Sequence, residues 1–309
     1  MKIASITVFC NEIFRLNDWI RYYSEYKDCI TLHIIVNNGC PEDTELLKQS
    51  FPDSVVLESS NQNLLKAYNL GVKYALLDDN IDAIMQITND IKFENGAIPK
   101  MYDVLFSKKE IAIVGPVLLK KDSQIVEVFG IDTYRNHLIS GRQVFPYRGM
   151  TILDIPMNIR KVSYVSAGVI MQKRSAIEEI GFQDETINMY CDERDVAIRL
   201  RKLGYYEVVT KSAVAWHQHI NKEGKTGRSL FAPFYSSRNS IYLIYKHSNI
   251  INAIWKSQKT ILYHVALIVY HLLKGEYNKT RFDFTIILGT MYGLFKKMDN
   301  YPQWLLLNK

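Results

Sequence analysis

Ala83-Ile84-Met85-Gln86-Ile87-Thr88-Asn89-Asp90 joins a short apolar run to a polar turn that ends in a carboxylate. The run has the length and the apolar character of a strand buried in a sheet. Ligands of α/β sheets bind beyond the carboxyl ends of the strands, so Asp90 is placed to face a metal ion or a phosphate-bound cation. A lone Asn-Asp pair also forms ordinary turns, and its place after a strand favours the functional interpretation.

The residues before this stretch alternate between strand and helix patterns. We predict strands over residues 3–9, 32–36, 55–57 and 83–87, and helices over 16–26, 42–49 and 64–77. Such alternation predicts an α/β fold with a mostly parallel sheet flanked by helices. Two further polar turns, Cys10-Asn11-Glu12 and Asn37-Asn38-Gly39, would then lie at the same edge of the sheet as Asp90.

The alternation loosens after residue 96. Strand patterns recur at 111–116, 162–165 and 169–171, whereas residues 120–160 have no clear period. We therefore expect three parts: residues 1–95, residues 96–220 and a helical C-terminal region, 221–309.

A second acidic cluster, Asp192-Glu193-Arg194-Asp195, opens a helical pattern. Carboxylates are favoured in the first turn of a helix without any chemistry, which is the plain alternative. Three acids within four residues repel one another, however, and this raises the proton affinity of at least one, as a general base requires. His217 and His219 alternate along a strand pattern, and we favour His217 as the ligand of a metal ion or a diphosphate.

Composition limits the class of protein. A net charge of +6 over 309 residues is too diffuse to indicate nucleic acid, and 48% hydrophobic residues predict a folded chain. The four cysteines have no paired spacing and no leader precedes the first strand pattern, so we expect a cytoplasmic protein.

Two apolar segments near the C-terminus, residues 261–273 and 284–295, are shorter than the roughly 20 residues that span a bilayer. Lysines, tyrosines and tryptophans flank them, as in helices that lie in a membrane interface. Packing on the sheet or on a second subunit, as a homo-oligomer, is the alternative, and both remain open.

The order of these motifs resembles the inverting family 2 glycosyltransferases with a GT-A fold, a Rossmann-like sheet flanked by helices, here with a C-terminal helical extension. The rhamnosyltransferase-like bacterial branch, which builds surface polysaccharides, is the most similar. The motifs that carry the resemblance are Val36-Asn37-Asn38-Gly39, Asn61-Gln62-Asn63, Thr88-Asn89-Asp90, Ser166-Ala167-Gly168, Met189-Tyr190-Cys191-Asp192-Glu193-Arg194-Asp195, Trp216-His217 and Arg238-Asn239. Thr88 replaces the first carboxylate of the usual metal motif, and Asn37 replaces the usual aspartate.

The resemblance implies a role for each part and each motif. Residues 1–95 would be the nucleotide-sugar-binding half of the GT-A domain, and residues 96–220 the acceptor-binding and catalytic half. Asp90, with His217, would hold Mg²⁺ or Mn²⁺, and Glu193 or Asp192 would be the catalytic base. The donor, a UDP- or dTDP-sugar, would be bound by Phe9, Asn11, Asn37, Asn63, Asn89 and Gly168.

The resulting hypothesis is metal-assisted, inverting transfer of a hexosyl or deoxyhexosyl group to a glycan or lipid-linked oligosaccharide. The reaction would take place in the cytoplasm, peripherally on the inner face of the cell membrane. A nucleotidyltransferase is one alternative, although the turn after residue 9 lacks the glycine that its phosphate loop needs. A non-catalytic membrane adaptor is the other, although it has no use for carboxylates at strand ends.

Overall fold

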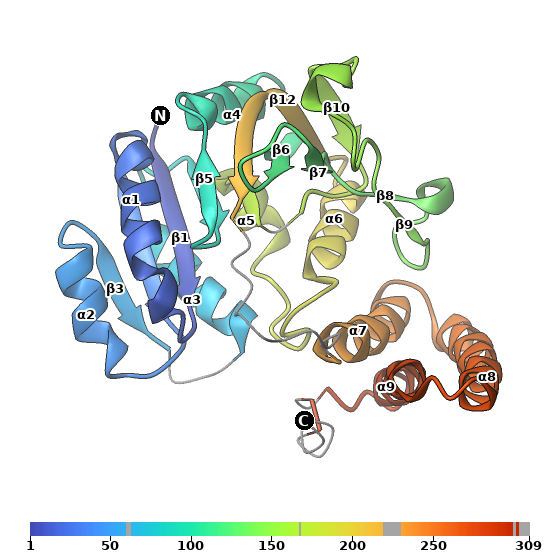
Figure 1. Cartoon of the computed structure of the whole chain (residues 1–309). Helices are drawn as coiled ribbons and strands as arrows, with labels where there is room; N and C mark the ends of the chain where they lie inside the picture. Colours follow the sequence, from blue (N-terminus) through green and yellow to red (C-terminus); the bar gives the residue numbers. More distant parts are fainter. Residues whose placement is uncertain (60–62, 167, 219–229, 299–300, 303–309) are drawn as a thin grey trace. The chain divides into compact units, whose positions relative to one another are not determined.

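The structure, a computed structural model, describes residues 1–59, 63–166, 168–218, 230–298 and 301–302. His219 and the motif residues Asn61, Gln62 and Ala167 lie outside this part of the chain. Contacts divide the chain into two units, drawn together in Figure 1. The sheet unit comprises Met1–Glu185 and Val196–Asn221, and the helical unit comprises Thr186–Asp195 and Lys222–Lys309.

The sheet unit begins with four parallel strands. They are β1 (Ile3–Phe9), β2 (Leu32–Asn37), β3 (Val55–Glu58) and β4 (Ala83–Ile87). Their order in the sheet is β3-β2-β1-β4, so the direction in which strands are added reverses between β1 and β4. A crevice at such a reversal is where open α/β sheets bind their ligands.

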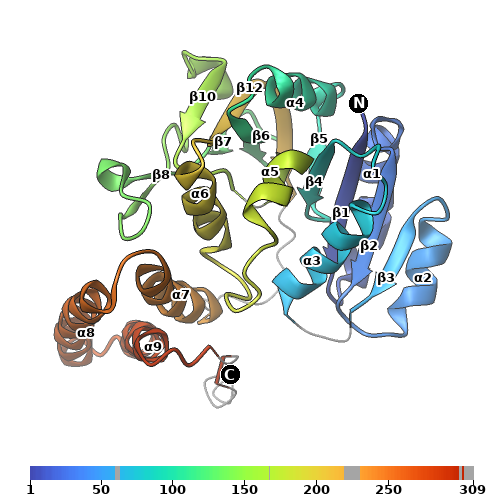
Figure 2. The ribbon, with the colours of Figure 1, turned by 180° about the vertical axis from the view of Figure 1, so that it is seen from behind.

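Helices cover both faces of these strands. They are α1 (Leu16–Tyr26), α2 (Asp43–Ser50) and α3 (Leu64–Ala75). Figure 1 shows α1 in front of β1, and Figure 2, the view from behind, shows α3 on the opposite face. Alternation along β1 explains this arrangement, because Ile6 packs with Val72 of α3, whereas Phe9 packs with Trp19 of α1.

Later strands extend the sheet beyond β4. They are β5 (Ile91–Phe93), β6 (Ile111–Lys120), β7 (Val126–Val128), β10 (Ile159–Val162), β11 (Val169–Lys173) and β12 (Tyr206–His217), with β8 (Asp132–Thr133) and β9 (Gln143–Val144) in a separate pair. β11 runs antiparallel between β4 and β6, and β12 runs parallel to β6. The helices in this half are α4 (Ala97–Phe106), α5 (Arg174–Ile180) and α6 (Asp192–Lys202). The mostly parallel sheet flanked by helices is confirmed.

The helical unit contains α7 (Phe231–His247), α8 (Ile250–Leu273) and α9 (Tyr277–Leu294). Glycines allow α9 to approach the backbone of α7. A Cβ at Gly293 would press on the Arg238 carbonyl oxygen and lie 2.9 Å from Ile241 Cβ. Gly289 and Gly293 stand four positions apart on α9. Two small residues at this spacing let helices pack closely, and the pattern is common in membrane proteins.

The polarity of α8 is reversed relative to an ordinary amphipathic helix, whose apolar stripe faces inward. Its fully buried residues are the small Ala253 and Ser257, whereas Ile251, Leu262 and Leu273 are 73%, 71% and 84% exposed. No helix in the described part of the chain has the length and apolar character that crossing a membrane needs.

Candidate active site

Asp90 lies in the turn between β4 and β5, at the strand reversal beside β1. Arg15 Nη1 donates a hydrogen bond to Asp90 Oδ2 over 2.7 Å, and Thr88 Oγ1 donates one to Oδ1 over 2.7 Å. His217, the last residue of β12, places its Nε2 3.3 Å from the same Oδ2. The β5–β12 pairing sets this approach, because His217 stands opposite Ile91. The structure therefore brings together the two residues predicted to share a metal ion.

His217 stands between two carboxylates. Its Nδ1 lies 3.6 Å from Glu127 Oε2 of β7. Burial alone would lower the pKa of the His217 ring, but Asp90 and Glu127 outweigh it and raise this pKa to about 9. Burial also acts to raise the pKa of Asp90, but His217, Thr88 and Arg15 outweigh it and hold this pKa well below its usual range. At neutral pH the site thus contains an ionised carboxylate between two cations.

The turn after β1 supplies a second layer of contacts. Asn89 Nδ2 donates a hydrogen bond to Glu12 Oε2 over 2.8 Å, and Glu12 Oε1 lies 3.7 Å from Arg15 Nε. On the other side, the Gly168 carbonyl oxygen accepts a hydrogen bond from the Thr88 amide over 3.0 Å. Asn89 and Gly168 therefore hold the Thr88-Asn89-Asp90 turn from two directions.

The residues predicted to bind the nucleoside lie at the carboxyl ends of β1 and β2. Phe9 is buried, and its carbonyl oxygen accepts a hydrogen bond from the Asn38 amide over 2.8 Å. Asn37 is also buried, and its Nδ2 donates to the Cys40 carbonyl oxygen over 2.8 Å. Asn11, at φ 56°, accepts from the Cys40 amide over 2.7 Å. These bonds tie the turns after β1 and β2 to each other.

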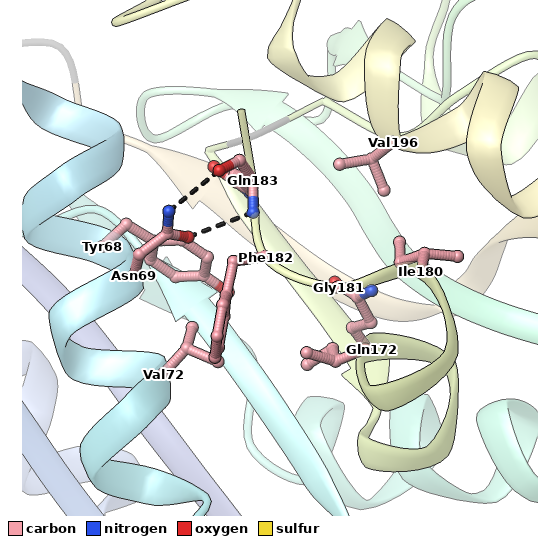
Figure 3. Close-up of a pocket in the computed structure, with 10 residues that line it drawn as sticks. Tyr68, Asn69, Val72, Gln172, Ile180, Gly181, Phe182, Gln183 and Val196 are labelled. Carbon is pink, nitrogen blue, oxygen red and sulfur yellow. Dashed lines mark hydrogen bonds between the residues drawn. The ribbon is translucent and has the colours of Figure 1, made fainter. Parts of the chain in front are cut away.

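Asn63 and Asn69 fasten α3 to the segment that follows α5. Asn63 caps α3, because its Oδ1 accepts from the amides of residues 65 and 66, and its Nδ2 donates to the Glu185 carbonyl oxygen over 2.6 Å. Figure 3 shows Asn69 facing Gln183, with hydrogen bonds of 2.9 and 3.1 Å between side chain and backbone. The cavity in that view is about 10 Å³, room for one water molecule and not for a sugar.

A divalent metal ion fits this site only if a ligand shares it. Within the described residues, no group of three or more His, Cys, Asp or Glu side chains could hold a metal ion by itself. Asp90 supplies a carboxylate, and His217 supplies an imidazole once its ring proton is displaced, both suited to Mn²⁺, but Arg15 already occupies Asp90 Oδ2. Diphosphate oxygens would complete such a coordination shell and would also accept hydrogen bonds from the Arg15 guanidinium group.

The second acidic cluster begins α6 within the helical unit. Burial, and then the charge of Glu193, raise the pKa of the Asp192 carboxyl well above its usual range. Asp195 is neutralised instead, because Lys246 Nζ and His247 Nε2 lie 2.8 and 2.7 Å from its Oδ1. The raised proton affinity expected from repulsion among three acids thus falls on Asp192, with burial as its main cause.

Two side chains of α7 hold the loop that leads into this cluster. Asn239 Nδ2 contacts the carbonyl oxygens of Met189, Tyr190 and Ile187 at 2.7, 2.9 and 3.1 Å. Arg238 Nη2 donates to the Ile187 carbonyl oxygen over 2.8 Å, and its Nε donates to Asn239 Oδ1 over 2.9 Å. Both side chains are fully buried. We call this set, Arg238 and Asn239 on the three carbonyl oxygens, the loop clamp.

The clamped loop is strained. Asn188, Tyr190 and Cys191 have φ angles of 68°, 61° and 68°, in the left-handed region that non-glycine residues rarely adopt. Such conformations cost about 1–3 kcal/mol each and persist where surrounding contacts enforce them. The loop clamp supplies these contacts immediately before Asp192.

No pattern in the sequence points to Arg15 or Glu127. The sequence marks the loop-clamp residues Arg238 and Asn239 only as a motif, without a structural role. Arg15 is 75 positions from Asp90 in the chain, and nothing in its own neighbourhood marks it. Arg238-Asn239 did carry a signal, because the pair belongs to the motifs of the resemblance. Its burial and its carbonyl partners become visible only in the structure.

No protein-family model matches the chain. It is 32% identical over 89 residues to an N-acetylglucosaminyl-diphospho-decaprenol L-rhamnosyltransferase of Mycobacterium tuberculosis, in the strains CDC 1551 / Oshkosh and ATCC 25618 / H37Rv. This match spans 29% of the chain and 29% of the relative's length.

Two solved structures are similar over most of the chain. GalNAc-T7 with UDP, GalNAc and Mn²⁺ has a TM-score of 0.57 at 12% identity, over 79% of this chain and 47% of that one. The mannosyltransferase PcManGT of Pyrobaculum calidifontis, in complex with GDP-Man and Mn²⁺, has a TM-score of 0.56 at 11% identity, over 96% and 88%. With the curled, mostly parallel sheet and its flanking helices, these likenesses show that the chain has the GT-A fold.

Proposed function

We propose that this chain is an inverting glycosyltransferase that moves a sugar from a nucleoside diphosphate sugar to a hydroxyl group of a lipid-linked glycan. The observation that carries the proposal is Asp90, an ionised carboxylate between Arg15 and His217 at the strand reversal of a GT-A sheet. A departing diphosphate needs positive charge beside it, and these two cations supply it. The structural neighbours with bound UDP or GDP-Man, and the rhamnosyltransferase relative, support the same class of reaction.

The reaction we propose is a single displacement. An acceptor hydroxyl oxygen bonds to the anomeric carbon while the bond from that carbon to the diphosphate oxygen breaks. The nucleoside diphosphate leaves with the electron pair of that bond, and the acceptor proton passes to a carboxylate. We assign the role of base to Glu193, with Asp192 as the alternative. Both residues begin α6, directly after the loop that the loop clamp holds in place.

Mg²⁺ or Mn²⁺ held by Asp90 and His217 would displace the ring proton of His217, supply positive charge in its place and act as a Lewis acid toward the diphosphate. The chain's own residues do the rest. Arg15 binds phosphate oxygens, and Asn89 and Gly168 keep the Asp90 turn in place. Thr88 hydrogen-bonds Asp90 Oδ1 and so orients the carboxylate. The residues around Phe9, Asn11, Asn37 and Asn63 would contact the nucleoside of the donor.

We place the reaction in the cytoplasm, at the inner face of the cell membrane. The reversed polarity of α8 supports this, because an apolar outer stripe is unfavourable in water and favourable among lipid chains. Exposed Lys256, Lys274 and Lys279 add attraction to anionic headgroups. Association with a second copy of the chain through the same stripe is the competing arrangement.

Glu193→Gln and Asp192→Asn test the proposal. We expect Glu193→Gln to lower transfer about 10²–10⁴-fold, the usual contribution of a general base, while donor binding survives. Glu25→Gln, on the exposed side of α1, is the matched control. Transfer is measured with a panel of sugar nucleotides, with and without Mn²⁺, and donor binding by the thermal shift that a ligand produces.

Loss of donor binding in Glu193→Gln would place that residue elsewhere in the site. If only Asp192→Asn abolished transfer, Asp192 would be the base. If no sugar nucleotide stabilised the protein or was consumed under any metal condition, the chain would not be a glycosyltransferase.

A further inference from the structure

Glu127 is a partly buried carboxylate beside Asp90 and His217, and the proposed reaction gives it no role. Its side chain is 20% exposed, and that of His217 is 19% exposed. Glu127 Oε2 lies 3.6 Å from His217 Nδ1, whereas the other ring nitrogen, Nε2, lies 3.3 Å from Asp90 Oδ2. Each nitrogen of the His217 ring therefore has its own carboxylate.

A β-bulge gives Glu127 this position. In the antiparallel pair of β6 and β7, Val128 stands opposite Leu118, and Val126 stands opposite Leu119. Two residues of β7 that are two positions apart thus pair with adjacent residues of β6, which leaves Glu127 as the extra residue. Bulges redirect a side chain and are common next to active sites. The strand pairing therefore supplies a local reason why the Glu127 side chain reaches His217.

The bulge is held from both faces of the sheet. Val126 packs in one apolar cluster of the sheet unit and Val128 in another, although in a regular strand both would face the same side. The Glu127 carbonyl oxygen accepts a hydrogen bond from Arg148 Nε over 3.0 Å. Removing the bulge would take one of the two valines out of its cluster. Buried neighbours therefore fix the position of Glu127.

The order of the strands brings Glu127 and His217 together. β12 pairs with one edge of β6 as far as His217 and Lys120, so β7 pairs with the opposite edge of β6. Figure 1 shows the three strands side by side. His217 is the last residue of β12 and Glu127 the middle residue of β7, so strands and not loops carry both side chains. Side chains on strands hold a geometry more precisely than side chains on loops.

The place of the ring proton decides whether His217 can bind a metal ion. The nitrogen near Asp90 is Nε2, and it binds a metal ion only when it carries no proton. A neutral imidazole keeps one proton, which can lie on either nitrogen. Asp90 alone would favour a proton on Nε2, because its carboxylate can accept a hydrogen bond from that position. Glu127 favours the opposite tautomer, with the proton on Nδ1 and a bare Nε2.

We propose that Glu127 is a positioning residue that holds the proton of the neutral His217 ring on Nδ1 and so presents a bare Nε2 to the divalent metal ion. The inference deepens the proposed function and rests on it, because the metal ion is the one that Asp90 and His217 would bind. Glu127 acts through His217 and is not a ligand itself. Within the described residues, no three His, Cys, Asp or Glu side chains are grouped so that they could hold a metal ion.

The test measures Mn²⁺ binding to the full chain in the presence of UDP and, separately, of GDP. Electron paramagnetic resonance gives the affinity from the loss of the free Mn²⁺ signal. Pulsed resonance on the same samples detects a nitrogen atom bonded to Mn²⁺, and the variant His217→Gln identifies the signal that comes from His217.

Two variants remove different properties of the Glu127 side chain. Glu127→Gln loses the charge and keeps an acceptor oxygen, and Glu127→Met loses both. Glu94→Gln is the control, because it removes the same charge from the turn after β5, where the side chain is 47% exposed. Melting curves check that each variant is folded.

We expect Glu127→Met to weaken Mn²⁺ binding about tenfold or more, because the partners of a metal-bound histidine contribute about 10–100-fold to metal affinity. Glu127→Gln should fall between the wild type and Glu127→Met, because its amide oxygen still accepts a hydrogen bond from Nδ1. The nitrogen signal should weaken in the same order. Glu94→Gln should stay within about twofold of the wild type, because salt screens an exposed charge.

Unchanged Mn²⁺ affinity and an unchanged nitrogen signal in both Glu127 variants would overturn the inference. A wild type without the nitrogen signal would overturn it too, because His217 would then not be a ligand, and equal weakening by Glu94→Gln would leave only a long-range effect of charge. Sugar nucleotide consumption is measured in parallel. Unchanged Mn²⁺ binding in the variants of a protein that consumes a donor rejects this inference alone, whereas a wild type that binds Mn²⁺ and consumes no donor rejects the proposed function.

Discussion

Asn239→Leu removes the amide of the loop clamp and keeps the volume of the side chain. The wild-type Nδ2 contacts three carbonyl oxygens at 2.7, 2.9 and 3.1 Å, but an amide has only two hydrogens. The loss is therefore two hydrogen bonds from Nδ2 and the one that Asn239 Oδ1 accepts from Arg238 Nε, worth about 1 kcal/mol each, together with the cost of polar atoms left buried without a partner. We expect the free energy of unfolding to fall by about 3–5 kcal/mol.

The loss of the clamp should also slow the reaction. Asn188, Tyr190 and Cys191 can leave their left-handed conformations once the clamp is gone, and the start of α6 moves with them. Misplacing a catalytic group by about 1 Å costs on the order of 10²-fold in rate. We therefore expect kcat to fall by about that factor, with the KM for the donor almost unchanged, because Asp90 and its partners are untouched.

Urea unfolding and steady-state kinetics measure the two effects. Asn252→Leu makes the same chemical change at an exposed position of α8 and should alter stability by less than about 0.5 kcal/mol. Unchanged kcat in a destabilised Asn239→Leu protein would show that the loop positions no catalytic group. Unchanged stability would show that the clamp does not form in solution.

Two further predictions concern stability. Burial lowers the pKa of His33, beside Trp19 and Tyr23, to about 3 from an ordinary 6.5. As the pH falls, His33 is protonated near pH 6.5 in the unfolded chain but only near pH 3 in the folded protein. Above about pH 6.5 the ring is neutral in both states and costs no stability. Below that pH the free energy of unfolding should fall by up to about 1.4 kcal/mol per pH unit. His33→Phe should flatten that slope in urea unfolding between about pH 6.5 and about pH 4, and an unchanged slope would contradict the assignment. Gly293→Ala should destabilise the helical unit by about 1–3 kcal/mol, because the new methyl group meets the α7 backbone, although alanine is the better helix former. Met291→Ala, on the exposed side of α9, is its control, and a melting temperature of Gly293→Ala at or above that of the wild type would refute the close packing.

The first half of the sheet was predictable because its signals are local. Residues 3–9 and 83–87 are mostly apolar runs, and the structure has β1 and β4 with these bounds. The strand predicted at 111–116 was cut at Pro116, whereas β6 continues to Lys120. Pro116 stands opposite Thr210, where the β6–β12 register shifts, and proline is tolerated in strands at such irregularities.

Residues 120–160 could not be predicted because their elements are held by distant partners. β7 is three residues long and exists through its pairing with β6, and β8 has only two residues paired with β9. The strand predicted at 162–165 lies at 159–162, because pairing with β12 ends at Val162. Hydrophobic periodicity along the sequence gives no signal for pairings with strands that are distant in the chain.

The candidate site divides in the same way. Asp90 was found from its place after a strand, and the structure adds that His217 reaches it. Arg15 was missed because only the β1–β4 adjacency brings it to Asp90. Asp195, one of three acids expected to repel one another, instead contacts Lys246 and His247 of α7, more than 50 positions along the chain.

The division of α6 between the two units bears on how this sequence can be recombined with its relatives. Residues 186–195 have partners in Arg238, Asn239, Lys246 and His247, so the acidic motif is bonded to the C-terminal helices of its own unit. A chimera that exchanges the C-terminal helices must carry those ten residues with them. We expect the two segments of the helical unit to be inherited as a pair, although Val196–Asn221, which belong to the sheet unit, separate them in the chain.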